Sequence, residues 1–355
     1  MFLCSQSESV ENSRTGTVQG IGSASALPSK SMETVVRECL AKFKGDMHLP
    51  GSAGFIEALK EATAANFANS ARCPALILCP DCTQDVVLAL RAVRRAREQR
   101  LLGDTAVSVC GGGHSRLCVV DGAVLLQMRR MRDVSFSSDV GGVGVVTLGA
   151  GARMGEVLEC AEKHGTAVPV GTWAGVGVGL MLTGGVGHLT RSHSVCVDNL
   201  VEVEIVTPGG EVLRLPSDSG APGAPFDLWW ACRGSAANFG VVTRVSVRAF
   251  PVGPVLFAQR VVPVESSDNW GAAVSRLVFI EDTVRALPES QHCDMAFGYT
   301  ENGEGVMGVQ PVSIHGEPFT SEACETLGVE PLDFSVCKFK DIPFGGVCSP
   351  ASSSW

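Results

Sequence analysis

The sequence predicts an α+β fold with two main domains, on the evidence of chain length, composition and the order of its apolar segments. The chain has 355 residues, enough for two domains that each bury a core. Hydrophobic residues make up 45% and charged residues 18%, which is typical of a globular protein. Short apolar strands recur with helices between them, but without the strict strand–helix alternation of a parallel α/β sheet. The predicted class is therefore α+β.

The first predicted elements lead into a run of three glycines. Alternating apolar residues predict a strand at 75–80, and residues 83–100 have the apolar spacing of an amphipathic helix with Thr83 as its N-cap. Residues 106–110 predict another strand, which ends abruptly at Gly111–Gly113. Residues 122–151 predict two strands joined by a basic connector, with a turn at Gly141–Gly142. A helix is expected at 152–164 and ends at Gly165. A hairpin at 201–215 that turns at Pro208–Gly210 and a strand at 240–250 complete the elements expected up to residue 250.

The pattern changes after Pro251, which predicts a second domain. Residues 269–287 have a helical pattern, and residues 294–314 predict a hairpin that turns at Glu301–Gly303. The predicted organisation is a disordered polar tail at 1–31, lead-in helices at 32–72, a first domain at 73–250 and a second at 251–355.

Charge and cysteine usage limit the partners and the compartment. Lys and Arg number 28 against 37 Asp and Glu, so the net charge of -9 repels phosphate backbones and no nucleic-acid partner is expected. The N-terminus lacks a basic region followed by an apolar run, so no secretory signal is expected. The 14 cysteines have no repeated spacing, and the close pair Cys79 and Cys82 has no second pair, so reduced thiols and a cytoplasmic location are expected.

Several familiar site motifs are incomplete. Gly149, Gly151 and Gly155 have nearly the spacing of a dinucleotide fingerprint, but the carboxylate that should follow about 20 residues on is missing. The residues around Ser115 lack the last glycine of a hydrolase nucleophile elbow, and the chain has no P-loop motif. His188 and His193 are five residues apart, on different helix faces and with no cluster of further ligands nearby, so no metal site is predicted.

A long uncharged stretch, Gly165–Gly187, is rich in glycine and contains Pro169. This composition leaves little apolar side chain for lipid, so no membrane span is expected. Glycines supply exposed N–H groups and room for a flat or phosphorylated ligand to touch the main chain. Together with Gly111–Gly113, the stretch predicts two glycine-rich surfaces that share one extended cofactor.

Five motifs, in order, carry a resemblance to a known family. They are VSVCGGGHS, VTLGAGARMGEVL, HGTAVPVGTWAGVGVGLMLTGGVGHLTR, CVDNLVEVEIVTPGGEVL and FDLWWACRGSAANFGVVTRVSVR. This order resembles the berberine-bridge-enzyme-like FAD-linked oxidases of the vanillyl-alcohol oxidase and p-cresol methylhydroxylase (PCMH) superfamily. The resemblance implies a PCMH-type FAD-binding domain of two α+β subdomains over 73–250, followed by a substrate domain whose antiparallel sheet covers the flavin. Family members continue beyond this sheet, so residues 251–355 are expected to form a partial, C-terminally shortened substrate domain.

The resemblance also implies which residues contact FAD. The Gly111–Ser115 loop would hold the diphosphate, and His114 matches the histidine that many members bond to the flavin 8α-methyl group, so covalent FAD is expected. The alternative is that His114 only ends a glycine turn. Trp173 stands where some members have a second linking cysteine, so at most one covalent bond is expected. The implied cofactor-binding residues are Gly111, Gly112, Gly113, His114, Ser115, Gly175, Val176, Gly177, Gly179, Leu180, Gly184, Gly185, Gly187 and Val241.

Three positions depart from the family pattern or are ambiguous. Cys110 replaces the usual arginine before the glycines, and Ser194 replaces a glycine where a positive φ would strain any other residue. Tyr299, the only tyrosine, is the candidate catalytic base, with a core or rim role as the alternative.

The function implied by the resemblance is an FAD-dependent oxidase. It would transfer a hydride from a C–H bond next to oxygen or nitrogen of a small-molecule substrate to flavin N5, with O2 as electron acceptor and hydrogen peroxide as product. The alternative is a truncated, non-catalytic relative that binds FAD. A nicotinamide dehydrogenase is the third hypothesis and rests only on Gly149, Gly151 and Gly155. The sequence indicates no oligomeric state.

Overall fold

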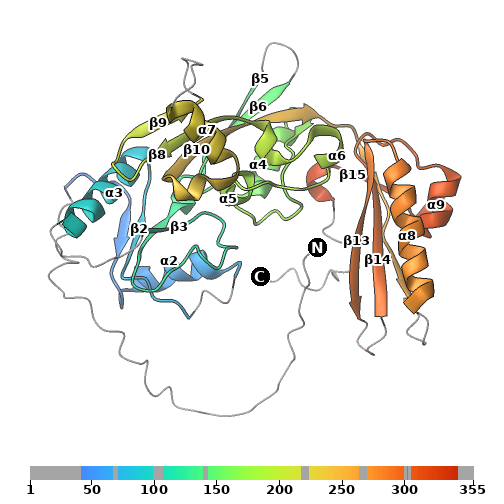
Figure 1. Ribbon diagram of the computed structural model, residues 1–355, viewed down its shortest axis with the longest axis horizontal. Helices are drawn as coiled ribbons and strands as arrows, with labels where there is room; N and C mark the ends of the chain where they lie inside the picture. The colour runs from blue at the N-terminus through green and yellow to red at the C-terminus, as the bar shows by residue number, and fades with distance from the viewer. Residues whose placement is uncertain are drawn as a thin grey trace.

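The computed structural model describes residues 41–66, 71–98, 107–138, 143–216, 224–263, 270–299, 302 and 305–342. They form three β-sheets that follow one another along the molecule, with helices packed on them (Figure 1).

The first sheet is mostly parallel and forms one end of the molecule. Its central strands are fully buried because α2 and α3 pack on it. The apolar face predicted for α3 is buried, including Val86, Val87 and Val93. Only β1 is antiparallel to its neighbour. In spatial order the strands are β1 (Asp46–His48), β2 (Leu76–Cys79), β4 (Val124–Gln127) and β3 (Val107–Cys110), and the helices are α2 (Ala53–Thr63) and α3 (Thr83–Glu98).

The second sheet is antiparallel throughout and lies in the middle of the molecule (Figure 1). The long strand β10 (Val241–Pro251) pairs with three other strands and holds the sheet together. The other strands are β5 (Val134–Ser138), β6 (Gly144–Gly149), β7 (Thr166–Ala167), β8 (Leu200–Val206) and β9 (Val212–Leu215). The helices are α4 (Met154–Glu162), α5 (Val178–Met181), α6 (Thr190–His193) and α7 (Ala224–Ser235).

The third sheet is antiparallel and follows β10 directly. Figure 1 shows α8 and α9 covering the face of this sheet that is turned away from the rest of the molecule. The strands are β11 (Val255–Phe257), β12 (Arg260–Pro263), β13 (Gln291–Tyr299), β14 (Gly305–Ser313) and β15 (Ser335–Cys337), and the helices are α8 (Trp270–Ala286) and α9 (Ser321–Leu327). Short 3₁₀ turns lie at Met128–Arg130, Cys196–Asn199, Ala236–Asn238, Pro331–Asp333 and Phe339–Asp341.

This arrangement confirms the predicted α+β class with two subdomains before residue 251 and an antiparallel sheet after it. One expectation is corrected. The segment 32–72 was expected to be helical, but its described part contains strand β1 as well as helix α2. The edge of β2 offers free backbone groups, and Asp46–His48 pairs with them. The predicted tail at 1–31 and the Gly141–Gly142 turn lie outside the described residues, as does most of the Glu301–Gly303 turn.

Candidate functional site

The two glycine-rich segments meet in the structure. Gly111–Gly113 follow β3, and Gly175–Gly177 precede α5. A Cβ atom on Gly112 would overlap the backbone of Gly177, and one on Gly177 would overlap the backbone of Gly112. Because the two main chains are in direct contact, only glycine fits at either position. The fold therefore joins the two surfaces that the sequence predicts to share one ligand.

His114 lies at this junction with one ring nitrogen unused. Its Nε2 atom is buried and makes no hydrogen bond of good geometry with the described residues, and a Cβ on Gly175 would lie 3.6 Å from it. The side-chain amide of Asn66 donates to the His114 carbonyl oxygen at 2.9 Å and fixes the loop. Burial lowers the pKa of His114, and nearby Arg153 lowers it further, while the backbone of Gly175 acts in the opposite direction. The ring is therefore neutral at physiological pH, with a nitrogen available to a ligand.

Arg153 is a site residue that the sequence analysis missed. Its backbone bridges to Gly177, and its Nε atom is buried without a hydrogen-bond partner among the described residues. Its charge acts on both His114 and Cys110, so it lies close to the first glycine loop. A buried, unpartnered guanidinium N–H beside glycine amides suits an anionic group such as a diphosphate. The sequence signal for this residue is the single arginine within the glycine-rich motif VTLGAGARMGEVL.

The remaining glycines of the second segment separate into two groups. Nothing lies within 4 Å of the Cβ position of Gly179 or Gly184, so both border open space. By contrast, a Cβ on Gly185 would lie 2.6 Å from the Cβ of Cys196, and one on Gly187 would overlap the carbonyl of Val170. Close packing therefore explains Gly185 and Gly187 without a ligand.

Exposed apolar side chains accompany both glycine segments along the chain. Trp173 and Val186 from the second segment and Leu117 from the first loop are exposed, by 42%, 69% and 80%. Leu180 and Val176 instead face protein, since Leu180 contacts Gly171 and Val176 packs against the core of the second sheet. Exposed apolar groups next to bare backbone are typical of a site for a flat ring.

Val241 lines a separate cavity of about 540 Å³. Val107 and Val109 of β3 line the same cavity, and β3 runs on into Gly111. The cavity is therefore bordered by the same strand that leads into the first glycine loop.

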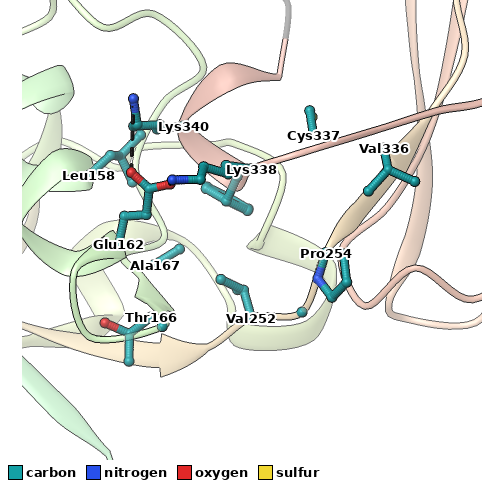
Figure 2. Close-up of a pocket in the computed structure, with 13 residues that line it drawn as sticks. Leu158, Glu162, Thr166, Ala167, Val252, Pro254, Val336, Cys337, Lys338 and Lys340 are labelled. Atoms are coloured by element: carbon teal, nitrogen blue, oxygen red, sulfur yellow. Dashed lines mark ion pairs between the residues drawn. The ribbon is translucent and has the colours of Figure 1, made fainter.

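A second cavity, of about 440 Å³, lies at the junction of the second and third sheets (Figure 2). Glu162 of α4 and two lysines from the segment after β15 face each other there, with Nζ to carboxylate distances of 3.0 Å for Lys338 and 3.8 Å for Lys340. Its lining includes Gly165–Ala167 at the start of the second glycine-rich stretch, but none of Gly111–Gly113 or Gly175–Gly187.

Three other sequence-based predictions concern Ser115, Tyr299 and the histidine pair. Ser115 is exposed at the loop end, where its Oγ accepts from the Leu117 amide at 3.1 Å. Tyr299 ends β13, paired with Gly305, and its side chain lies outside the described residues. His193 stacks on Phe250, whereas His188 lies beside a histidine of β13, so the pair seen in the sequence is not a pair in space.

The glycines of the dinucleotide-like spacing have packing roles. A Cβ on Gly149 or Gly151 would overlap the carbonyl of Met131 or Met128. These glycines therefore allow β6 to pass the preceding 3₁₀ turn, and the spacing no longer supports a nicotinamide site. The uncharged stretch Gly165–Gly187 forms β7, loops and the short α5, and no helix in the described part of the chain is long and apolar enough to cross a bilayer.

Comparison with known proteins identifies the domain. Residues 74–216 match the FAD binding domain family. The chain is similar to chitooligosaccharide oxidase of Gibberella zeae, with 27% identity over 296 residues that cover 81% of this chain and 54% of the relative. It is also similar to (R)-6-hydroxynicotine oxidase of Paenarthrobacter nicotinovorans, with 33% identity over 174 residues that cover 48% and 35% of the two chains.

Solved structures show the same fold. A variant of berberine bridge enzyme superimposes with a TM-score of 0.72 at 16% identity, over 87% of this chain and 61% of that chain. The chain thus spans about a third to three fifths of the length of these proteins. The geometry fits FAD, since a bare backbone cradle, a buried unpartnered imidazole nitrogen and an unpartnered guanidinium N–H converge. Residues 74–216 therefore match an FAD-binding domain, and the chain as a whole has the fold of the berberine-bridge-enzyme-like FAD-linked proteins that it resembles.

Proposed function

We propose that this chain is an FAD-dependent oxidase acting on a small molecule. The observation that carries the proposal is the unpartnered Nε2 of His114 where the two glycine loops meet. Bound FAD would supply a hydride acceptor at N5 for a C–H bond next to oxygen or nitrogen, with O2 as final acceptor and hydrogen peroxide as product.

The residues of the glycine loops would hold the cofactor. The amides of Gly111–Ser115 and the guanidinium of Arg153 would bind the diphosphate, and the cavity beside Val241 would take one end of the dinucleotide. The neutral His114 ring would form the covalent bond through Nε2, because this nitrogen makes no hydrogen bond of good geometry with the described residues. Gly179 and Gly184 would lie against the flavin side, where the backbone borders open space.

The third sheet would supply the substrate side. His292 and Asp294 lie on the face of β13 that meets the FAD-binding domain, since both are close to His188. Gln310 pairs with Asp294 across β13 and β14 and is buried. A polar face opposite the cofactor suits a substrate with hydroxyl or amine groups. Tyr299 ends the same strand, but it is five residues from Asp294 and therefore holds a position on the other face of β13. Tyr299→Phe tests the base expected from the sequence: replacement of a base would lower kcat more than flavin content.

Related proteins act on substrates of this kind, as the names chitooligosaccharide oxidase and 6-hydroxynicotine oxidase indicate. The free thiols of the described cysteines also agree with a reducing, cytoplasmic compartment, which we propose as the location.

The first experiment tests the covalent bond. The chain is expressed, precipitated with acid and washed, and flavin fluorescence is measured in the pellet. The wild-type protein should keep its fluorescence and His114→Ala should lose it, while His193→Ala, which alters a histidine stacked on Phe250, should behave as the wild type. Equal fluorescence in all three pellets would refute the bond to His114, and a colourless protein would refute FAD binding.

The second experiment tests turnover. Alcohols, sugars and amines are added anaerobically to the yellow protein, and flavin absorbance is followed. Bleaching that O2 reverses, with release of hydrogen peroxide, is expected for an oxidase. A yellow protein that no substrate bleaches would instead be a non-catalytic FAD-binding relative.

A further inference from the structure

Three side chains with metal-ligand atoms lie together where the third sheet meets the FAD-binding domain. His188 is in the loop before α6, and His292 and Asp294 are two residues apart on β13, hence on one face of that strand. His188 Nδ1 is 2.8 Å from His292 Nε2 and 3.4 Å from Asp294 Oδ2. The three ligand atoms all lie within 4.8 Å of one another.

Hydrogen bonding within the protein leaves this group incompletely satisfied. Both rings are buried, with 7% of His188 and 8% of His292 exposed. The two facing nitrogens can share only one proton, and the other nitrogen of His292, Nδ1, has no partner among the described residues. Two imidazoles held this way in a dry interior cost free energy unless another group joins them.

The spacing fits a small divalent cation. Zn²⁺ binds imidazole nitrogen and carboxylate oxygen at roughly 2.0–2.2 Å, so two ligands in a tetrahedron are about 3.3–3.6 Å apart. The distance from His188 to Asp294 has this value. The two rings are closer by about half an ångström, as expected while their nitrogens share a proton and not a metal ion.

Arg191 does not occupy the site, because its guanidinium donates to the carbonyls of Val284 and Leu287.

We propose that His188, His292 and Asp294 bind one divalent transition-metal ion of the Zn²⁺ type, which links β13 to the FAD-binding domain. Two imidazoles and one carboxylate form a ligand set that suits zinc, and they leave a fourth position for water or a polar group of a substrate. The sequence predicts no metal site, since only His188 and His193 are neighbours along the chain. The structure replaces that pair with ligands from a strand about a hundred residues further on.

The test is metal binding by the full chain after treatment with a chelator. Zn²⁺ binding is measured by equilibrium dialysis, and Co²⁺ is used as a spectroscopic substitute. We expect one tightly bound ion per chain and a visible Co²⁺ spectrum without a thiolate charge-transfer band, which would exclude the cysteines as ligands. Asp294→Asn and His292→Gln should each weaken binding by more than the roughly 10–100-fold that loss of a second-shell partner costs. His193→Gln should bind as the wild type does.

Four results would overturn the proposal: no stoichiometric Zn²⁺, a thiolate band with Co²⁺, unchanged affinity in Asp294→Asn, or lost affinity in His193→Gln. The side chain of Asp294 is 33% exposed, so Asp294→Asn should fold even if His292→Gln does not. Zn²⁺ should also raise the Tm of the wild type and leave that of Asp294→Asn unchanged. None of these readouts needs FAD or turnover, so they stand apart from the proposed oxidase activity.

Discussion

At the scale of single residues, we expect Arg153 to compensate for the positive charge that Cys110 lacks. Cys110 stands where the resembling family has arginine, and its thiol is buried near the carbonyl of Ala62. It cannot offer a positive charge to a phosphate. Arg153 approaches the same loop from the start of α4 and carries that charge.

Arg153→Met is therefore expected to weaken FAD binding. Loss of a charged hydrogen bond of about 1.5–3 kcal/mol corresponds to roughly 10–150-fold in Kd. The measurement is flavin titration in the His114→Ala background, where binding is reversible. Arg132→Met is the matched control, because Arg132 forms an ion pair with Glu156 at 3.7 Å and its side chain is 61% exposed. Equal affinities of the two variants would argue against a role for Arg153.

Ser194 is the only non-glycine residue with a positive φ in the described part of the chain. Its φ of 64° and ψ of -176° lie in a region that is essentially restricted to glycine. The strain expected at this position from the sequence is thus present. A hydrogen bond of 2.6 Å from Ser194 Oγ to Asp198 Oδ2 offsets part of it.

Ser194→Gly should raise the free energy of unfolding by about 1 kcal/mol, because relief of roughly 1–3 kcal/mol of strain exceeds the lost hydrogen bond and the added unfolded-state entropy. Ser194→Ala keeps the strain and loses the bond, so it should be less stable than the wild type. Urea unfolding of the three proteins gives their order of stability. A glycine variant with a lower free energy of unfolding than the alanine variant would contradict the prediction.

At the scale of elements, Glu204 of β8 joins three parts of the FAD-binding domain. Its carboxylate accepts hydrogen bonds from Thr83 at the start of α3, Thr243 of β10 and Arg214 of β9, at 2.7, 2.9 and 3.1 Å. Burial alone would raise its pKa, but these donors outweigh burial and the pKa is lowered. A depressed carboxyl pKa stabilises the fold above the unfolded-state value of about 4.3 and ceases to do so as pH falls through the folded value.

Glu204→Gln should accordingly cost about 2–3 kcal/mol of unfolding free energy at pH 7. The gap between wild type and variant should shrink as pH falls below about 4, because the wild-type carboxylate becomes protonated. Urea unfolding at a series of pH values gives both the loss of stability at pH 7 and its change with pH. A gap that grows toward acid pH would show that the pKa is raised.

Most elements were predictable because their signals are local. The apolar faces of α3 and α4 and the hairpin around Pro208–Gly210 depend on residues close in sequence. Strand β1 was not predictable, since three residues form a strand only beside the open edge of β2. At the site, local motifs indicated the glycine loops, but the pairing of His188 with His292 and Asp294 needed the tertiary fold.

At the scale of the whole molecule, a small set of contacts fixes the third sheet to the FAD-binding domain. Ala167 and Leu189 share one core with Val255, Val312 and Ile314. Arg191 of α6 donates to the carbonyls of Val284 and Leu287, at 2.5 and 2.8 Å, near the C-terminal end of α8. A cation at this end of a helix is favourable because the free carbonyls carry partial negative charge.

Arg191→Met should loosen this attachment by about 2–3 kcal/mol, since two hydrogen bonds from a charged group are lost. Calorimetry should then resolve a separate, earlier transition for the third sheet, and proteolysis should be faster. Arg285→Met is the control, because Arg285 forms an exposed ion pair with Glu281 within α8 and its loss should leave the unfolding transition unchanged. The same single transition in both variants would refute this role of Arg191.

Strand β10 also sets the order in which the protein can mature during synthesis. The second sheet cannot form before residues 241–251 leave the ribosome, because β10 lies between β6 and β8 and also holds β7. The amide of Ala150, next to the glycine loops, bonds to Thr243 of this same strand. The strand that holds the glycine loops is therefore available only after residue 251 has been translated. Nascent chains halted before β10 should emerge without flavin, and those halted after it should be able to acquire it.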